Sequence, residues 1–205
     1  KQSVLERWKN YYSDLLNYDT PSNRSGDNVD ANPRPTPIDI GIENEITYSE
    51  LKKMLAKAKL GKAVGCDDLP MEVLNNETAH GFLLTLFRAC YNHDIVPSLW
   101  LKGIINPIPK DNTLDPRDPL NYRGITLACS MYKLYCGILN CRLVTWSEAN
   151  GLIADEQNGF RPDRSCQDQL STLTSIIETR LKNKLSTFAI YVDFSKAFDR
   201  IDRNF

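Results

Sequence analysis

The sequence has no Cys-x-x-Cys pair and only two histidines, His80 and His93, although it contains six cysteines. Zinc sites are usually built from closely spaced cysteine and histidine ligands, so this pattern excludes an ordinary zinc-binding domain. The cysteines also lack the spacing of a disulfide framework, which favours a reduced, intracellular chain. We expect both histidines to be surface or capping residues rather than metal ligands.

The chain also lacks a secretory signal, an apolar run of membrane-spanning length and an excess of positive charge. Its formal net charge is −1, whereas nucleic-acid-binding domains usually carry a basic surface, so any such binding must come from local patches. The composition, 41% hydrophobic and 25% charged residues, is that of a globular protein without membrane contact. Because the chain opens on Lys1 and stops at Phe205, we expect a piece of a longer protein.

Hydrophobic periodicity predicts helices in the first part of the chain. An apolar stripe with three- and four-residue spacing marks residues 1–17 as an amphipathic helix. Residues 18–41 have no such period and are rich in Pro, Asn and Ser, as in a linker. Thr47 and Glu50 have the spacing of a capping box, which starts a helix that we expect Gly61 to end.

Three more helices are predicted further along the chain. The first runs from Thr78 to His93, and the second starts at Ser130, which we expect to cap it, and is closed by Gly151. The third follows Ser165 and is expected to bury an apolar face between Leu170 and Leu181.

The stretch from Thr187 to Arg203 combines a strand pattern with an acid. Residues 188–192 are apolar and rich in β-branched and aromatic side chains, which predicts a half-buried strand ending at Asp193. A carboxylate at the end of a rigid strand is a usual place to bind a divalent metal. The alternative is that Asp193 only caps the following turn.

The string Tyr-Val-Asp-Phe-Ser-Lys-Ala-Phe-Asp, residues 191–199, closely resembles the first catalytic motif of reverse transcriptases from non-LTR (LINE-type) retrotransposons. That resemblance implies that Asp193 is a metal-binding catalytic aspartate, with the backbone carbonyl of Phe194 as a further oxygen ligand. It also implies that Phe198 is the bulky side chain that blocks the 2′-hydroxyl of a nucleotide and so favours deoxynucleotides.

The loop from Gly61 to Glu72 resembles the segment that precedes the fingers in the same family, where it is associated with holding template RNA. The resemblance implies that Lys62 contacts nucleic acid. Val64 replaces the usual proline and Asp68 the usual glycine. Asp68 is the less favourable change, because glycine there permits a backbone angle that aspartate adopts less easily. The alternative is an ordinary loop between two helices.

Ile108-Pro109-Lys110 and the run from Asn121 to Leu127 resemble the paired fingers motifs of this family, and we expect strands on both sides of a polar loop. Lys110 and Arg123 flank that loop and are expected to converge on the triphosphate of an incoming nucleotide, as a point charge and a planar fork. Taken singly, each is an ordinary surface charge. Gly124 stands where the family often has proline.

The pattern Gln-x-Gly-Phe-Arg-x-x-Arg-Ser is among the more specific motifs of the family. Its candidate nucleic-acid-binding residues are Gln157, Gly159, Phe160, Arg161 and Arg164. A glycine allows close backbone approach, two arginines suit phosphates and an aromatic ring can stack on a base. The alternative is an arginine-rich loop that caps the next helix through Ser165.

The resemblance implies an α+β fold, helix-rich with a few strands, made of the fingers and a partial palm of a right-hand polymerase. The expected segments are an N-terminal helix (1–17), a linker (18–41), a helical pre-fingers region (42–95), the fingers (96–184), and the first palm strand with the catalytic motif (185–205).

The implied function is RNA-directed DNA synthesis on retrotransposon RNA by two Mg²⁺ ions, for which Mn²⁺ can substitute. The implied partners are an RNA template, a DNA primer, deoxynucleoside triphosphates and the rest of the polyprotein, in a nuclear and cytoplasmic ribonucleoprotein. No Tyr-x-Asp-Asp motif occurs in the chain, so we expect it to be inactive alone. One alternative is a non-catalytic RNA- or DNA-binding remnant. An Asp-nucleophile phosphohydrolase is disfavoured because Ser195 stands where a second acid is usual.

Overall fold

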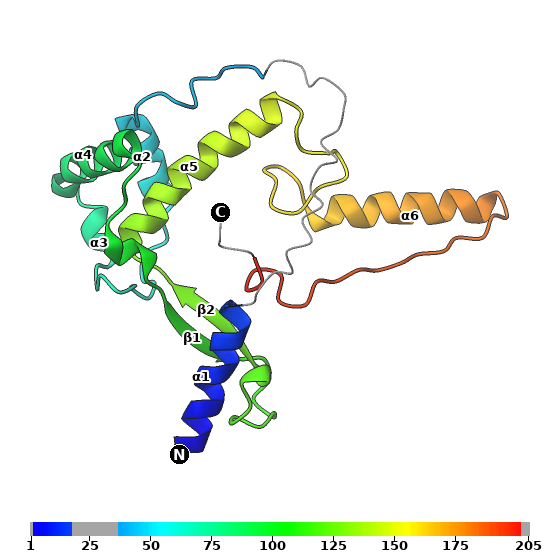
Figure 1. Ribbon diagram of the computed structural model, residues 1–205. Coiled ribbons are helices and arrows are strands. Elements are labelled where there is room, and N and C mark those ends of the chain that lie inside the picture. Colours follow the sequence, from blue (N-terminus) through cyan, green and yellow to red (C-terminus); the bar gives the residue numbers. More distant parts are fainter. Residues whose placement is uncertain (1, 18–36, 202–205) are drawn as a thin grey trace. The chain divides into compact units, whose positions relative to one another are not determined.

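The computed structural model describes residues 2–17 and 37–201 (Figure 1). The chain divides into two compact units. Unit 1 comprises Lys1–Tyr12 and Pro33–Asn150, and unit 2 comprises Ser13–Asn32 and Gly151–Phe205. The predicted linker 18–41 lies outside the described residues as far as position 36.

The described elements are mostly helical. In chain order they are α1 (Gln2–Leu16), α2 (Tyr48–Lys57), α3 (Met71–Leu74), α4 (Glu77–His93), a 3-10 turn (Ser98–Leu101), β1 (Ile104–Pro109), a second 3-10 turn (Pro119–Asn121), β2 (Tyr122–Leu127), α5 (Ser130–Ala149) and α6 (Cys166–Lys182). Helices with one two-stranded sheet are compatible with the predicted α+β class. None of the described helices is both long and apolar enough to span a bilayer.

The core of unit 1 forms where α2, α4 and α5 pack together, with α3 beside them (Figure 1). Its largest fully buried side chains include Phe87, Leu51, Leu83 and Leu134. The ring of Phe87 lies 5.5 Å from Tyr135, measured between centroids. Each such side chain contributes about 1.5 to 3 kcal/mol when it is removed from water, so this cluster provides most of the driving force for the unit.

Helix α2 begins as the sequence predicts, with a capping box. The hydroxyl of Thr47 accepts a hydrogen bond from the backbone N–H of Glu50 at 3.3 Å, and the carboxylate of Glu50 accepts one from the N–H of Thr47 at 2.8 Å. The predicted end at Gly61 is wrong. Ala58 stands at the C-terminal cap in an extended conformation, and its N–H bonds to the carbonyl of Leu55, which closes the helix early.

Helix α4 confirms the prediction for residues 78–93 to within one residue. Asn76 caps it, because its side-chain oxygen accepts from the N–H of Thr78 at 3.0 Å. The expectation for His93 is confirmed, since this residue is exposed in the last turn. The expectation for His80 is wrong: it lies one turn before Leu83 on the core face, is buried, and has its Nδ1 3.2 Å from the hydroxyl of Tyr48.

The two strands form an antiparallel hairpin, as predicted, and α1 packs beside it (Figure 1). The ring of Trp8 meets that of Tyr122 edge-on, with 4.8 Å between centroids. A Cβ atom placed on Gly124 would lie 3.0 Å from Cε1 of Tyr12, so the missing side chain makes room for that ring. An ion pair between Arg7 and Asp118 at 3.2 Å adds a contact at the hairpin tip.

Helix α5 starts differently from the prediction. Cys129 is the N-terminal cap, and Ser130 instead donates its hydroxyl to the carbonyl of Leu69 at 2.8 Å. The carboxylate of Asp67 accepts from the N–H of Ser130 at 3.1 Å, so a distant loop supplies the capping oxygen. At the other end Gly151, with φ of +60°, follows the helix as predicted.

Unit 2 contains α6, whose start has the Ser165 cap that the alternative interpretation of the Gly-Phe-Arg loop expected. Ser165 and Asp168 form a capping box, with the hydroxyl of Ser165 accepting from the N–H of Asp168 at 3.3 Å. The predicted buried face is wrong, because none of the described residues of α6 is buried and Leu170 and Ile176 are largely exposed. The apolar stripe therefore has no covering element in the part of the chain that the structure describes.

The predicted half-buried strand at residues 188–192 is also wrong. This segment has no assigned secondary structure, and Phe188 is 93% exposed and Ile190 90% exposed. A strand is stable only when its N–H and C=O groups pair with a neighbour, and β1 with β2 is the one strand pair among the described residues.

Candidate nucleotide and nucleic-acid interface

The hairpin places Lys110 and Arg123 beside each other on one exposed side. Its register pairs Ile108 with Arg123, and the N–H of Lys110 bonds to the carbonyl of Asn121 at 2.8 Å, which extends the ladder by one step. Because strand side chains alternate, Ile108 and Lys110 follow the same face as Arg123. Both cationic residues are exposed, so this face offers two positive groups from opposite strands.

The ammonium group of Lys110 is already partly engaged. It donates to the carbonyl of Leu120 at 2.7 Å, across the base of the tip. A lysine ammonium has three N–H donors, so two remain for a ligand. The contact holds the side chain close to the hairpin.

The hairpin tip is a hydrogen-bonded turn rather than an open loop. Asp111 accepts from the N–H and the hydroxyl of Thr113, both at 2.9 Å, and these bonds lower the pKa of its carboxyl group. Asp115 accepts from the N–H of Arg117 at 2.9 Å, and that bond lowers its pKa too. The tip therefore carries ionised carboxylates, which restrict an anionic ligand to the cationic face.

The loop that carries Lys62 is anchored to the start of α5. A Cβ atom on Gly65 would lie only 2.5 Å from the backbone carbon of Ala128, so only glycine fits that contact. Asp67 caps α5, and Asp68 adopts φ of +51° in the left-handed region. The expected awkward backbone angle at Asp68 is thus confirmed. Lys62 itself is exposed at the edge of this anchored loop.

The Gly-Phe-Arg loop of unit 2 is held together by its own arginine. The guanidinium of Arg161 donates to the carbonyl of Ala154 at 2.9 Å and to that of Gln157 at 3.2 Å, and its side chain is 9% exposed. The amide of Gln157 in turn donates to the carbonyl of Gly159 at 2.9 Å. In this arrangement Arg161 shapes the loop instead of presenting its donors to solvent.

The remaining two candidate residues of this loop, Arg164 and Phe160, are at least partly exposed to solvent. Arg164 pairs with Asp155 at 3.2 Å and keeps part of its guanidinium exposed. Phe160 has φ of +63° and is 93% exposed, and its ring lies 6.2 Å from that of Phe198 at 86° between ring planes. The structure thus brings together two motifs that the sequence separates by more than thirty positions.

Asp193 and Phe194 are the last two residues of the exposed segment 185–194. A magnesium ion takes oxygen ligands in octahedral geometry, usually from one or two carboxylates and from substrate phosphates. In the described part of the chain no group of three or more acidic, cysteine or histidine residues is placed to hold a metal ion. Among the described residues, Asp193 is therefore not part of a group of three such side chains.

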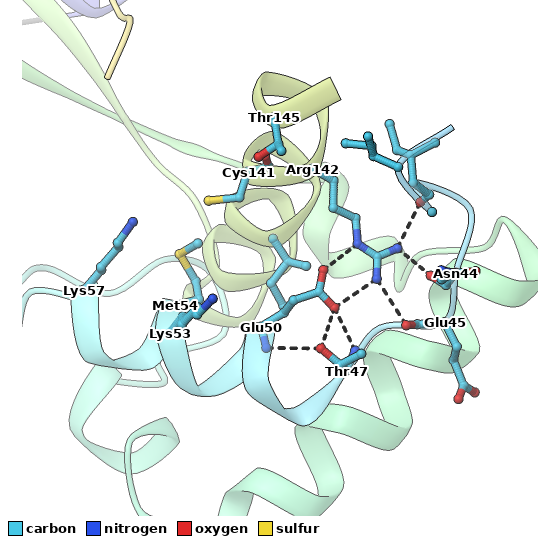
Figure 2. A pocket seen from close by; sticks show the side chains of 14 residues that line it. Asn44, Glu45, Thr47, Glu50, Lys53, Met54, Lys57, Cys141, Arg142 and Thr145 are labelled. Atoms are coloured by element: carbon cyan, nitrogen blue, oxygen red, sulfur yellow. Dashed lines mark hydrogen bonds and ion pairs between the residues drawn. The ribbon is translucent and has the colours of Figure 1, made fainter. Parts of the chain in front are cut away.

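A cavity of about 370 Å³ in unit 1 contains an ion pair that the sequence did not indicate (Figure 2). Arg142 on α5 donates to both carboxylate oxygens of Glu50, at 2.6 and 2.9 Å, and also to the carbonyls of Ile42, Asn44 and Glu45. The bonds from Arg142 are the main reason that the pKa of Glu50 falls to about 2. Because the protein itself uses the guanidinium donors, we interpret the Arg142–Glu50 pair as a structural contact that joins α5 to α2, and we call it the clasp.

The clasp was missed because its partners are far apart in sequence. The sequence indicates only a capping role for Glu50, and Arg142 stands ninety-two positions later on another helix. A lone arginine among apolar residues of α5 was the one available signal, since buried arginines require carboxylate or carbonyl partners.

Comparison with curated proteins finds relatives over most of the chain. It is 28% identical over 154 residues to the probable RNA-directed DNA polymerase from transposon X-element of Drosophila melanogaster, which covers 74% of this chain. It is also 28% identical over 158 residues to the RNA-directed DNA polymerase from mobile element jockey of the same species, covering 76% of the chain. The chain is homologous to the RNA-directed DNA polymerases of non-LTR retrotransposons.

This finding confirms the family resemblance predicted from the motifs. A more distant relative is the transposon TX1 uncharacterized 149 kDa protein of Xenopus laevis, 24% identical over 80% of the chain. The chain spans only 17% of the length of the X-element and jockey relatives. No protein-family model matches it.

Proposed function

We propose that this chain is the fingers and the start of the palm of an RNA-directed DNA polymerase with a right-hand fold. The homology to retrotransposon polymerases supports the reaction class. The observation that carries the assignment to particular residues is the hairpin register, which puts Lys110 and Arg123 on one exposed face. In this proposal the partners are an RNA template, a DNA primer and deoxynucleoside triphosphates, within a longer polyprotein.

Lys110 and Arg123 would bind the triphosphate of the incoming nucleotide. Arginine binds phosphate oxygens through two parallel N–H donors, whereas lysine adds a point charge that can shift between oxygens. Holding the departing pyrophosphate in line with the attacking hydroxyl lowers the entropic part of the barrier, and neutralising its charge lowers the electrostatic part.

Asp193 would provide one carboxylate ligand for magnesium, with the carbonyl of Phe194 next to it. When bound, two such ions supply charge neutralisation at the attacking and leaving oxygens. Phe198 would lie against the sugar and exclude a 2′-hydroxyl. The edge-on contact with Phe160 supports this role, because it restricts the directions in which the Phe198 ring can turn.

The chain by itself would be inactive, because it has one candidate catalytic carboxylate, Asp193, and no Tyr-x-Asp-Asp motif. The missing Tyr-x-Asp-Asp motif also favours the second candidate function, a non-catalytic RNA- or DNA-binding remnant. Primer extension on poly(rA)/oligo(dT) with the purified chain separates the two from an active enzyme. Incorporation that disappears in Asp193→Ala would overturn the proposed inactivity.

The hairpin assignment is tested in a longer protein that contains this chain. Arg123→Ala should lower kcat/KM for deoxynucleotides roughly 10- to 100-fold, the usual cost of a charge-assisted hydrogen bond, without weakening primer-template binding. Arg123→Lys should recover only part of this loss. The matched control is Arg117→Ala, which removes the same charge from the hairpin tip and should leave kcat/KM unchanged. Normal nucleotide use with lost template binding in Arg123→Ala would contradict the assignment.

A further inference from the structure

One face of the hairpin is covered by α1, and the opposite face carries the candidate cations (Figure 1). Arg123 is exposed, whereas its two neighbours in β2, Tyr122 and Gly124, are half-buried, as the alternation of strand residues requires. These two neighbours are the strand residues that α1 contacts. The helix therefore supports β2 immediately before and immediately after Arg123, from the face opposite to its side chain.

Trp8 makes the contact before Arg123. Its indole ring meets the ring of Tyr122 edge-on, with 4.8 Å between centroids and 68° between ring planes. Aromatic pairs in this geometry stabilise each other beyond the burial of their surface. The hydroxyl of Tyr122 also donates to the carbonyl of Pro116 at 3.2 Å. The Tyr122 ring is thus held by α1 and by the hairpin tip, and with it the backbone that leads into Arg123.

Tyr12 makes the contact after Arg123. A Cβ atom on Gly124 would lie 3.0 Å from Cε1 and 3.2 Å from the hydroxyl oxygen of Tyr12, so this ring covers the glycine closely. Glycine has more backbone freedom than any other residue, whereas the proline expected here from the family resemblance restricts its own backbone. The ring of Tyr12 therefore provides from outside a restraint that Gly124 does not provide by itself.

The same helix also contacts the tip that holds Lys110. Arg7 pairs with Asp118 at 3.2 Å, and the carboxylate of Asp118 accepts from the N–H of Leu120 at 3.1 Å. The carbonyl of Leu120 accepts from the ammonium group of Lys110 at 2.7 Å. Contacts that begin on α1 thus lead to both candidate cations of the hairpin.

We propose that Trp8 is a positioning residue for nucleotide incorporation: by holding Tyr122 in place, it directs Arg123 at the triphosphate on the other face. Trp8 itself contacts neither the nucleotide nor the template. The inference rests on the proposed triphosphate-binding role of Lys110 and Arg123. A support remote from the reaction matters because a misplacement of about 1 Å can cost about 100-fold in rate.

The test is single-nucleotide incorporation by a longer protein that contains this chain. Trp8→Leu keeps an apolar side chain but removes the aromatic contact. It should raise KM for deoxynucleotides and lower kcat, with roughly a 10-fold loss of kcat/KM and unchanged primer-template affinity. Trp8→Phe should recover most of this loss, because a phenyl ring can still meet Tyr122 edge-on. The matched control is Leu5→Ala on the same helix, where the residue is 70% exposed, and it should leave both constants unchanged.

A double-mutant comparison separates positioning from general stability. Trp8 lies outside the core cluster of unit 1, so Trp8→Leu should keep that core folded, which circular dichroism checks. In a protein that already carries Arg123→Ala, Trp8→Leu should lower kcat/KM less than about 2-fold, because its effect passes through the missing guanidinium. Losses that multiply, or a parallel loss of primer-template affinity, would reduce Trp8 to a structural residue and overturn the inference.

The same experiment tells the two proposals apart. A loss in Arg123→Ala with no loss in Trp8→Leu would overturn the positioning role alone. Unchanged kinetics in Arg123→Ala would overturn the triphosphate role of the hairpin, and the positioning role would fail with it.

Discussion

In unit 1 the hairpin with the candidate residues is flanked by the core residues Trp100 and Cys129, whereas in unit 2 the candidate residues lie on loops, and its helix α6 has no buried residue. Both the hairpin and the loop that carries Lys62 make long-range contacts: Trp8 of α1 meets Tyr122, and Asp67 accepts from the N–H of Ser130 at the start of α5. The Gly-Phe-Arg loop depends mainly on bonds within itself. A short motif can therefore contain all its residues and form its own hydrogen bonds, while no other element packs against it.

The largest contrast should appear when one phenylalanine is removed from each unit. Phe87→Ala should lower the free energy of unfolding by about 3 to 5 kcal/mol, because Phe87 is fully buried. Phe194→Ala should change it by less than about 0.5 kcal/mol, because Phe194 is 78% exposed. Urea unfolding followed by circular dichroism measures both. A comparable loss in the two variants would mean that segment 185–194 is packed.

The second contrast concerns two arginine–carboxylate pairs. Arg142→Ala should cost about 3 kcal/mol, because it leaves Glu50 and three carbonyl groups without their donor in a largely buried position. Arg164→Ala should cost about 1 kcal/mol at most, because its partner Asp155 is 90% exposed. Thermal unfolding of the two variants side by side provides the measurement, and a larger effect in unit 2 would reverse the comparison.

Acid should weaken the clasp of unit 1 in a defined pH window. The pKa of Glu50 is lowered to about 2 in the folded protein, so its contribution is present above the unfolded pKa near 4.5 and is lost as pH falls towards 2. Solvent screening of this partly exposed group keeps the effect to about 1 to 2 kcal/mol. Unfolding free energies at pH 7 and pH 3 measure it. Glu50→Gln is the control, and it should be less stable at pH 7 and lose this part of the pH dependence; an unchanged dependence would contradict the clasp.

The smallest effect is expected where aspartate adopts a left-handed backbone in each unit. Asp68→Gly should stabilise unit 1 by about 0.5 kcal/mol, since glycine adopts φ of +51° without strain, and Asp68→Ala should destabilise it. Asp163, with φ of +57°, is the counterpart in unit 2. If unit 2 adds little to the global transition, Asp163→Gly will not shift the midpoint of chemical unfolding, and a shift equal to that of Asp68→Gly would show that the two units unfold together.

Local signals predicted the elements well. The capping box at Thr47, the cap at Ser165, the extent of α4 and the hairpin all follow from patterns within a few residues, because caps and turns are formed by neighbouring groups. Two helix ends were predicted wrongly, since Ala58 rather than Gly61 ends α2 and Cys129 rather than Ser130 caps α5. The other errors concern burial. His80 is in the core, and the strand at 188–192 and the apolar stripe of α6 are not, since burial depends on which other elements arrive there.

By itself, the sequence determined the family, the order of the motifs and the residue types that suit phosphates and metal, because these are properties of short strings. Only the tertiary structure decided that Asp67 caps α5, that Arg142 clasps Glu50 and that Trp8 of α1 meets Tyr122. Each of these contacts joins residues more than sixty positions apart. Such contacts have no local pattern, since they arise from the packing of one element against another.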